Sequence, residues 1–366
     1  MRALMLAVVV GAVLAVACDR SGVEDPSIPP ASVTERPGTP LSPAPAGPTA
    51  APTPTGAATP GPTGGSAEAS PPQPLPQDAW SPRAEAPVPL TEVAAAPASG
   101  QIWVAGGLDD NGLAVRTVQV YDPTFDTWSG GPPLPEPVHH SALVSAGNEL
   151  YLVGGYVGSS FDQPTAAVHR FDAGAGEWVE APPLPQARAA GAAAWDGTRI
   201  VYGGGVGPDG LAGQVYALGA DGWDAIGSLS EPREHLGAAG DGQGRVWFLG
   251  GRRGGLDTNL GTVDLVEGDG ARRLGDLPTP RGGVAAFWSA PTGACLAGGE
   301  APSGTFAEVE CMDDQGEVRV LPDLDTPRHG LGAAFVDGFA YILLGGPEPG
   351  LSTSGAVETL PISPGG

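Results

Sequence analysis

The sequence predicts an all-β fold built from six repeats of a four-stranded unit. A pair of glycines recurs six times, and the successive intervals are 47 to 49 residues. The six pairs are Gly106-Gly107, Gly154-Gly155, Gly203-Gly204, Gly250-Gly251, Gly298-Gly299 and Gly345-Gly346. Each pair follows a short hydrophobic run such as Tyr151–Val153, which is typical of a buried strand. A fixed period of this length indicates an array of supersecondary units.

A second spacing places the outer strands of each unit. In three repeats an aromatic residue precedes a tryptophan by seven residues, namely Tyr121 and Trp128, Phe171 and Trp178, and Tyr216 and Trp223. The constant step indicates paired strands. The distance from the glycine pair to the aromatic residue varies, and this indicates a loop. Runs of small residues such as Ala189–Ala194 indicate an innermost strand where neighbouring units crowd, and Asp196-Gly197 after that run is a hairpin signal.

These glycine pairs and aromatic residues resemble the kelch motif, whose repeats form the blades of a β-propeller. The resemblance covers roughly residues 77–362 and implies a six-bladed ring. Trp80 lies 26 residues ahead of Gly106, just as Trp128 lies 26 residues ahead of Gly154. We therefore expect residues 77–82 to supply the outer strand of blade six and close the ring. Arg272 and Val318 depart from the pattern, because they stand where blades four and five should carry Trp.

The first 76 residues predict an export signal and a tether. The apolar run within residues 1–17 is shorter than the ~20 residues of a membrane span and indicates a signal peptide. We expect cleavage before Cys18 and a lipid on its thiol; an ordinary signal-peptidase site at Ala15–Ala17 is the alternative. Residues 18–76 are rich in Pro, Ala, Thr and Gly, so we expect a disordered linker. Residues 363–366 form a short tail.

The two remaining cysteines predict a disulfide in blade five. Cys295 lies in the second strand of that blade and Cys311 in the third, and antiparallel pairing about Ser303 places them opposite one another. Two buried free thiols are the alternative. A disulfide fits an oxidising compartment, so we expect the protein in the cell envelope, outside the cytoplasm.

The charge of the chain limits its partners. The formal net charge is −24, from 41 acidic against 17 basic residues. Binding to nucleic acid needs a positive stripe, and docking on anionic lipid needs basic residues, so neither is expected. We expect membrane contact through the lipid anchor alone, and a monomer.

Four arginines recur at the entrance of the predicted inner strands. They are Arg188, Arg233, Arg281 and Arg328, which precede their glycine pairs by 15 to 17 residues. A ring of guanidinium groups at the channel mouth would bind an anion such as a peptide carboxylate, an acidic sugar or a phosphate. The alternative is that these arginines belong to the repeat and stabilise contacts between blades through carbonyl groups.

Histidines recur beside these arginines. They are His139, His140, His235 and His329, from blades two, four and six, and we include His140, His235 and His329 among the candidate ligand-binding residues. Zinc needs its nitrogen ligands within about 2.1 Å, and we expect alternate blades to hold these side chains too far from the axis. The expectation is therefore no metal and no other cofactor.

The kelch resemblance implies a binding or scaffold role, although some kelch-type propellers are enzymes. Copper-radical sugar oxidases need a Cys–Tyr crosslink with further Tyr and His ligands, and no matching set is found. A sialic-acid mutarotase needs an acid or base beside an arginine, and Glu234 next to Arg233 is the candidate acid. We expect a non-catalytic module that binds a protein or an acidic ligand at the mouth, near the loops Leu108–Arg116, Tyr156–Thr165 and Arg252–Leu260. The alternative is a carbohydrate-active mutarotase or epimerase acting on an acidic sugar.

Overall fold

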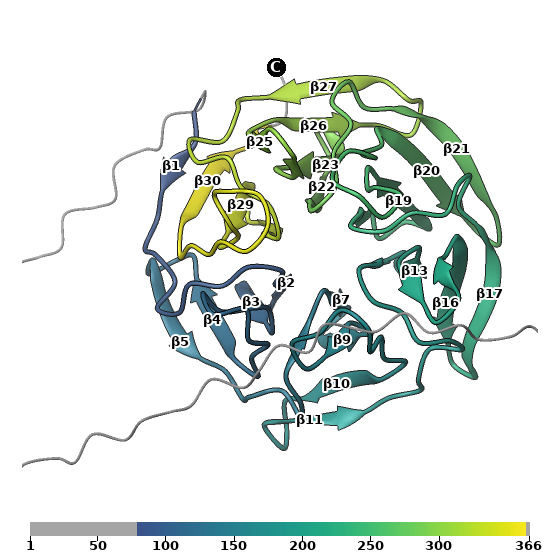
Figure 1. The fold of residues 1–366 in the computed structure, drawn as a ribbon, viewed down its shortest axis with the longest axis horizontal. Coiled ribbons are helices and arrows are strands. Elements are labelled where there is room, and N and C mark those ends of the chain that lie inside the picture. Colours follow the sequence, from purple (N-terminus) through teal and green to yellow (C-terminus); the bar gives the residue numbers. More distant parts are fainter. Residues whose placement is uncertain (1–78, 364–366) are drawn as a thin grey trace, which may run out of the picture. The chain divides into compact units, whose positions relative to one another are not determined.

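The chain folds into a closed ring of six blades around a central axis (Figure 1). The structure is a computed structural model, and it describes residues 79–363. The regular structure within this range consists of strands. Residues 79–363 contain no helix that is long and apolar enough to cross a membrane. The predicted signal peptide, Cys18, the linker 18–76 and residues 364–366 of the tail lie outside the described range.

Each blade is an antiparallel sheet of four strands. Blade one has β2 (Ala94–Ala98), β3 (Gln101–Ala105), β4 (Val118–Asp122) and β5 (Thr127–Gly130), and blade two has β7 (Ala142–Ala146), β8 (Glu149–Val153), β10 (Val168–Asp172) and β11 (Glu177–Glu180). Blade three has β12 (Ala192–Trp195), β13 (Ile200–Gly203), β16 (Gln214–Gly219) and β17 (Gly222–Ser228), and blade four has β18 (Gly237–Gly240), β19 (Arg245–Leu249), β20 (Thr262–Glu267) and β21 (Ala271–Asp276). Blade five has β22 (Ala285–Ser289), β23 (Gly293–Ala297), β26 (Val309–Met312) and β27 (Val318–Leu321). Blade six has β28 (Gly332–Val336), β29 (Phe339–Leu343), β30 (Val357–Pro361) and β1 (Ser81–Pro82).

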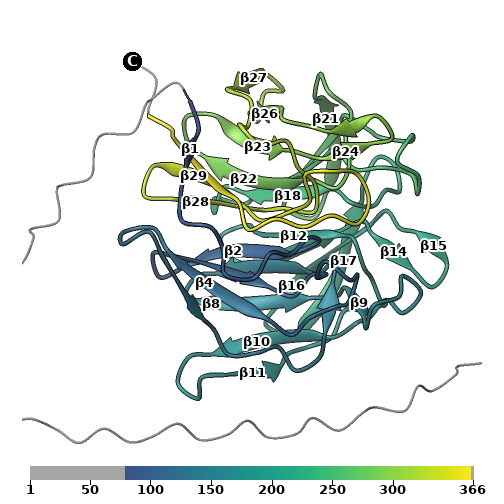
Figure 2. The same cartoon turned by 60° about the vertical axis from the view of Figure 1, so that its left-hand side comes forward.

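Three two-stranded ribbons extend from loops that join second and third strands or enter inner strands. They are β6 (Val138–His139) with β9 (Tyr156–Val157), β14 (Val206–Gly207) with β15 (Gly210–Leu211), and β24 (Glu300–Ala301) with β25 (Gly304–Thr305). Figure 2 shows β9, β14, β15 and β24 on the same side of the ring, at the right of the view. This side is called the mouth face below.

The ring closes through the N-terminal strand, as the position of Trp80 predicts. Strand β1 pairs with β30, and Ser81 lies opposite Thr359. The buried Trp80 indole donates a hydrogen bond of 2.8 Å to the carbonyl of Pro322, which follows the outer strand of blade five. The same bond to the preceding blade is made by Trp128 to Ala84, by Trp178 to Pro132 and by Trp223 to Pro182. Outer-strand tryptophans therefore fasten four of the six blades to their neighbours.

The recurring glycines also join each blade to the next. Gly154 has φ +61°, and a Cβ there would lie 2.5 Å from the carbonyl oxygen of Arg188. The Gly155 N–H donates to that same carbonyl at 2.8 Å. The equivalent bonds run from Gly107 to Val138, Gly205 to Arg233, Gly251 to Arg281, Gly299 to Arg328 and Gly345 to Leu90. A side chain at the first position would push the neighbouring blade away.

The predicted register of two glycine pairs is wrong by one residue. The equivalent positions in blade three are Gly204-Gly205, and in blade six they are Leu344-Gly345, since these residues carry the positive φ angles and make the joining bond. The sequence pairs Gly203-Gly204 and Gly345-Gly346 hide this shift, because runs of glycine and the neighbouring leucine leave the register undefined until the next blade is placed.

The predicted disulfide is present in blade five. Cys295 in β23 lies directly opposite Cys311 in β26, and their sulfur atoms are bonded. Both residues are fully buried in a hydrophobic cluster that includes Trp80 and Leu331. The bond therefore links the middle strands of the blade that Trp80 contacts.

Candidate functional site

One backbone position per blade forms the narrowest part of the channel. It lies two residues before each inner strand and is occupied by Glu92, His140, Ala190, His235, Gly283 and Gly330. All six have positive φ, between 53° and 73°. Their amides and carbonyls, closed by the amide of Val93, form six hydrogen bonds of 2.8–3.2 Å that run around the axis. This ring holds the four non-glycine residues in a conformation that otherwise costs roughly 1–2 kcal/mol each.

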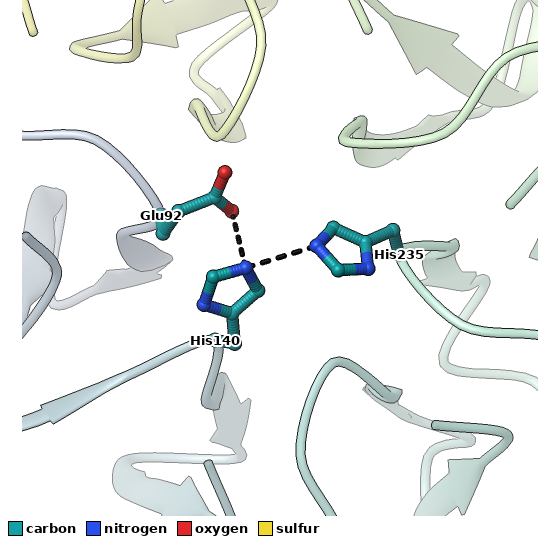
Figure 3. Close-up of side chains that lie close together, drawn as sticks. All are labelled: Glu92, His140 and His235. Carbon is teal, nitrogen blue, oxygen red and sulfur yellow. Dashed lines mark hydrogen bonds and ion pairs between the residues drawn. The ribbon is translucent and has the colours of Figure 1, made fainter. Parts of the chain in front are cut away.

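Three of these positions bring polar side chains together over the channel. The Nε2 atom of His140 lies 2.9 Å from Nε2 of His235 and 3.1 Å from Oε2 of Glu92 (Figure 3). The expectation that histidines of alternate blades stay too far apart to share an ion is therefore wrong for His140 and His235. The left-handed backbone turns at both positions aim the imidazoles toward the axis.

His329 joins the cluster from the position next to the ring. Its Nδ1 lies 3.2 Å from Oε1 of Glu92 and 3.7 Å from Oε2 of Glu300, while its Nε2 lies 3.1 Å from the carbonyl oxygen of Glu348. The structure thus brings the three predicted ligand-binding histidines around one carboxylate, Glu92, which sequence analysis missed.

Burial and charge set the ionisation of this cluster. Burial lowers the pKa of His140 to about 3, and the nearby Glu92 offsets this only in part, so the imidazole is neutral at pH 7. Burial also opposes the charge on Glu92 and His329. Their mutual contact, with His140 also acting on Glu92, holds the pKa of Glu92 well below its ordinary value and raises the pKa of His329. Glu92 is therefore a carboxylate at neutral pH.

A second chain of ion pairs supports His235. Glu234 Oε2 lies 3.0 Å from His235 Nδ1, and Arg252 lies 3.3 Å from Glu234 Oε1 and 2.8 Å from Glu300 Oε1. Burial would raise the pKa of Glu234, but the hydrogen bonds and charges of His235 and Arg252 lower it to about 2. A sugar-isomerising acid needs a raised pKa beside an accessible arginine, so this residue does not support the enzyme alternative.

The four arginines do not form the predicted anion-binding ring. Arg233, Arg281 and Arg328 have fully buried side chains that pair with Asp264 at 2.7 Å, Glu310 at 2.6 Å and Glu358 at 2.6 Å. Arg188 is also buried and donates to the side chains of Gln186 and Gln214. Each guanidinium turns into its own blade, because an acid or amide on the third strand offers it a partner there.

The structural reading of these arginines is confirmed in an altered form. Arg233 donates to the carbonyl oxygens of Gly250 and Phe248, which belong to its own blade. Contact with the preceding blade is made by the Arg233 backbone carbonyl, which accepts from Gly205. The partner acids follow their arginines by 29 to 31 residues, a spacing that could have revealed the pairs in the sequence.

Above the cluster lies an open pocket with a cavity volume of about 330 Å³, here called the mouth pocket. Its floor contains Glu92, His140, His235, His329, Glu300 and Arg252, and its apolar rim contains Leu108, Phe161, Leu256 and Leu351. Phe161 and Leu351 are 58% and 54% exposed. The three predicted loops each contribute to this pocket, whereas the loop that carries Leu351 was missed.

Below the floor the channel narrows and then widens again. The narrow part has a volume of about 80 Å³ and is lined by the ring position and the residues that follow it. The wider part, about 390 Å³, is lined mainly by inner-strand residues such as Ala95, Ala193, Ala238 and Ala333. Small side chains thus line the axis, as predicted for the innermost strands.

Comparison with known proteins identifies similar repeats. A family model described as the kelch motif matches residues 89–135 and 137–185. Kelch-like protein terF of Aspergillus terreus is 29% identical over 74% of this chain and 64% of its own length. Kelch-like protein 35 of Mus musculus is 32% identical over 42% of this chain and 25% of its own. Rab9 effector protein with kelch motifs, from Rattus norvegicus, is 38% identical over 30% and 31%. The chain thus spans less than two thirds of the length of these relatives.

A solved structure shares the fold. The structure titled "Structure of YjhT" matches with a TM-score of 0.61 and 14% identity, over 74% of this chain and 94% of that one. At this identity the match concerns the architecture alone.

Proposed function

Because the chain is a kelch-repeat β-propeller, a fold that commonly serves as a scaffold for protein interaction, we propose that it is a non-catalytic binding module. Its partner docks on the mouth face and places a side chain in the mouth pocket. The observation that carries this proposal is the exposed apolar rim around a charged floor.

The chemistry of the rim favours a protein as the partner. Phe161 contacts the imidazoles of His139 and His140, with ring centroids 4.9 and 5.3 Å apart, yet more than half of its surface stays exposed. Exposed aromatic and aliphatic side chains that surround a pocket are typical anchors of protein interfaces. The rat relative is named as an effector of Rab9, which also supports a binding role. The acidic ligand considered from the arginines loses its support, because their guanidinium groups are buried.

The proposal places this module outside the cytoplasm, anchored by a lipid on Cys18. The run of apolar residues before Cys18 and the Cys295–Cys311 disulfide support it. The test is a Cys18→Ser variant expressed in a bacterial host with its own signal sequence. We expect wild type in the detergent-soluble membrane fraction and the variant outside it. Equal membrane association of both proteins would contradict lipid anchoring.

Two phenylalanines make a matched test of the docking face. Phe161 belongs to the loop between second and third strands, whereas Phe125, which is 74% exposed, belongs to the β4–β5 hairpin at the opposite end of a blade. The full chain, Phe161→Ser and Phe125→Ser are used to capture envelope proteins from the source cells. A captured protein is then purified and titrated against all three chains.

We expect the purified partner to bind wild type and Phe125→Ser equally, and Phe161→Ser at least ten times more weakly. A buried aromatic anchor contributes 2 kcal/mol or more, roughly a thirtyfold change in affinity. A partner that binds both variants like wild type would move the docking site away from the mouth face. Equal loss in Phe125→Ser alone would assign docking to the opposite face.

A further inference from the structure

We propose that Glu92, His140 and His235 form a binding site for one divalent transition-metal ion at the floor of the mouth pocket. The donor atoms are Oε2 of Glu92 and Nε2 of each histidine, and they lie within 4.8 Å of one another. This inference is independent of the docking proposal, because it concerns the floor of the pocket and a metal ion as the only ligand.

The donor types and distances fit such an ion. Two imidazoles and one carboxylate suit zinc, iron, nickel or copper ions. In a tetrahedral site with bonds of about 2.05 Å, neighbouring donor atoms lie about 3.3 Å apart. The distances of 2.9 and 3.1 Å from His140 Nε2 to its two partners are close to this value. A shift of a few tenths of an ångström would therefore admit an ion among the three atoms.

Hydrogen bonding alone satisfies this arrangement poorly. Each imidazole Nε2 carries at most one proton, and the Glu92 carboxylate carries none. If one Nε2 is protonated, its single N–H is shared or a neighbouring lone pair is left facing another; if both are protonated, the two N–H groups point at each other. A cation between the three donors accepts all three lone pairs together.

The residues behind the histidines orient them as metal ligands. Metal-binding histidines usually donate their second ring N–H to a carboxylate or another acceptor. His235 Nδ1 lies 3.0 Å from Glu234, whose other oxygen is held by Arg252. His140 Nδ1 lies 2.6 Å from Nδ1 of His139. When these Nδ1 atoms carry the protons, both Nε2 lone pairs point at the axis.

The neighbouring ring positions leave space for the carboxylate. A Cβ at Gly330 would lie 2.9 Å from Cδ of Glu92 and 2.6 Å from its backbone nitrogen, so a side chain there would displace Glu92. The other Glu92 oxygen is held by His329 at 3.2 Å. Glu92, His140 and His235 all line the mouth pocket, so the ion's remaining coordination positions face the space that a docked ligand or water occupies. Glu92, Glu300 and His329 also converge, but they offer one imidazole only, and we favour the set with two.

The test is calorimetric titration of zinc chloride into the purified, chelator-treated full-length protein. His235→Asn removes one ligand and keeps the left-handed backbone, which asparagine tolerates. His169→Asn is the matched control, because His169 on β10 lies apart from the cluster and is the remaining histidine of the five in the chain. Glu234→Gln tests the supporting carboxylate. Thermal unfolding of each variant without metal checks that it folds.

We expect wild type and His169→Asn to bind one zinc ion per chain, with equal affinity. His235→Asn should bind at least 100 times more weakly, and Glu234→Gln 10 to 100 times more weakly. Zinc should raise the unfolding temperature of wild type and His169→Asn, and leave that of His235→Asn unchanged. The proposal is overturned if wild type binds no zinc at micromolar concentrations, or if folded His235→Asn binds it as tightly as His169→Asn does.

Discussion

The buried pair of Arg233 and Asp264 gives a direct test of what the recurring arginines do. Both side chains are 0% exposed, and their charged atoms lie 2.7 Å apart. Asp264→Asn keeps the shape of the side chain but leaves the guanidinium buried without its counter-charge. Breaking a buried pair on one side costs about 3–5 kcal/mol. At about 2 °C per kcal/mol for a domain of this size, the unfolding temperature should fall by roughly 6–10 °C.

The matched control lies in the same blade. Arg273 and Asp276 on β21 form an ion pair whose side chains are 51% and 53% exposed. An exposed pair contributes about 1 kcal/mol or less, so Asp276→Asn should lower the unfolding temperature by no more than about 2 °C. The assay is thermal unfolding of the full chain followed by circular dichroism at pH 7. Equal unfolding temperatures for the two variants would refute the assignment of Arg233 to blade stability.

Replacing both members of the buried pair separates charge from packing. In Arg233→Met with Asp264→Leu no unpaired charge remains, and such replacements are often neutral or stabilising. We expect the double variant to recover most of the loss caused by Asp264→Asn. If it unfolds at the lower temperature of the single variant, the packing of these side chains, and not their charges, determines the stability of the blade.

The remaining predictions concern the closure, the disulfide and the response to acid. Trp80→Ala should destabilise the propeller by about 3–5 kcal/mol, because a buried indole is lost from the strand that closes the ring; denaturant unfolding measures this, and a loss below 1 kcal/mol would contradict it. Cys311→Ser should cost about 3 kcal/mol, as expected for opening a cross-link between residues 16 apart, and added reductant should destabilise wild type but not the variant. Burial opposes the charge of Asp196, yet backbone and side-chain hydrogen bonds from Thr198 and Arg199 lower its pKa below the ordinary 3.8. Its stabilisation is therefore complete above that ordinary value and is lost as the pH falls through the lower, folded-state pKa. Asp196→Asn should accordingly unfold at a lower temperature than wild type at pH 7, and a gap of unchanged size at pH 2 would exclude this contribution.

Much of the fold could be predicted because each repeat carries its own local signals. Glycines at a fixed period mark positions where φ is positive and where the next blade approaches too closely for a side chain. The orphan Trp80 predicts the closing strand, since every unit needs an outer strand and only the N-terminal residues remain to supply that of blade six. The opposition of Cys295 and Cys311 follows from strand pairing alone.

The candidate site could be predicted only in part, since sequence places residues at a position but does not aim their side chains. Arg233 stands at the mouth in the sequence, yet it turns inward because Asp264, 31 residues later, meets it across the blade. Glu92 gave no signal of its own, although it occupies the same ring position as His140 and His235 in their blades.

The sequence by itself determined the number of blades, their closure and the disulfide, because these depend on periodic spacing and on pairing between neighbouring strands. Only the tertiary structure decided that His140 and His235 meet Glu92 on the axis. That meeting requires the closed ring of backbone hydrogen bonds, which holds the three residues in left-handed turns and directs side chains from three separate blades to one point.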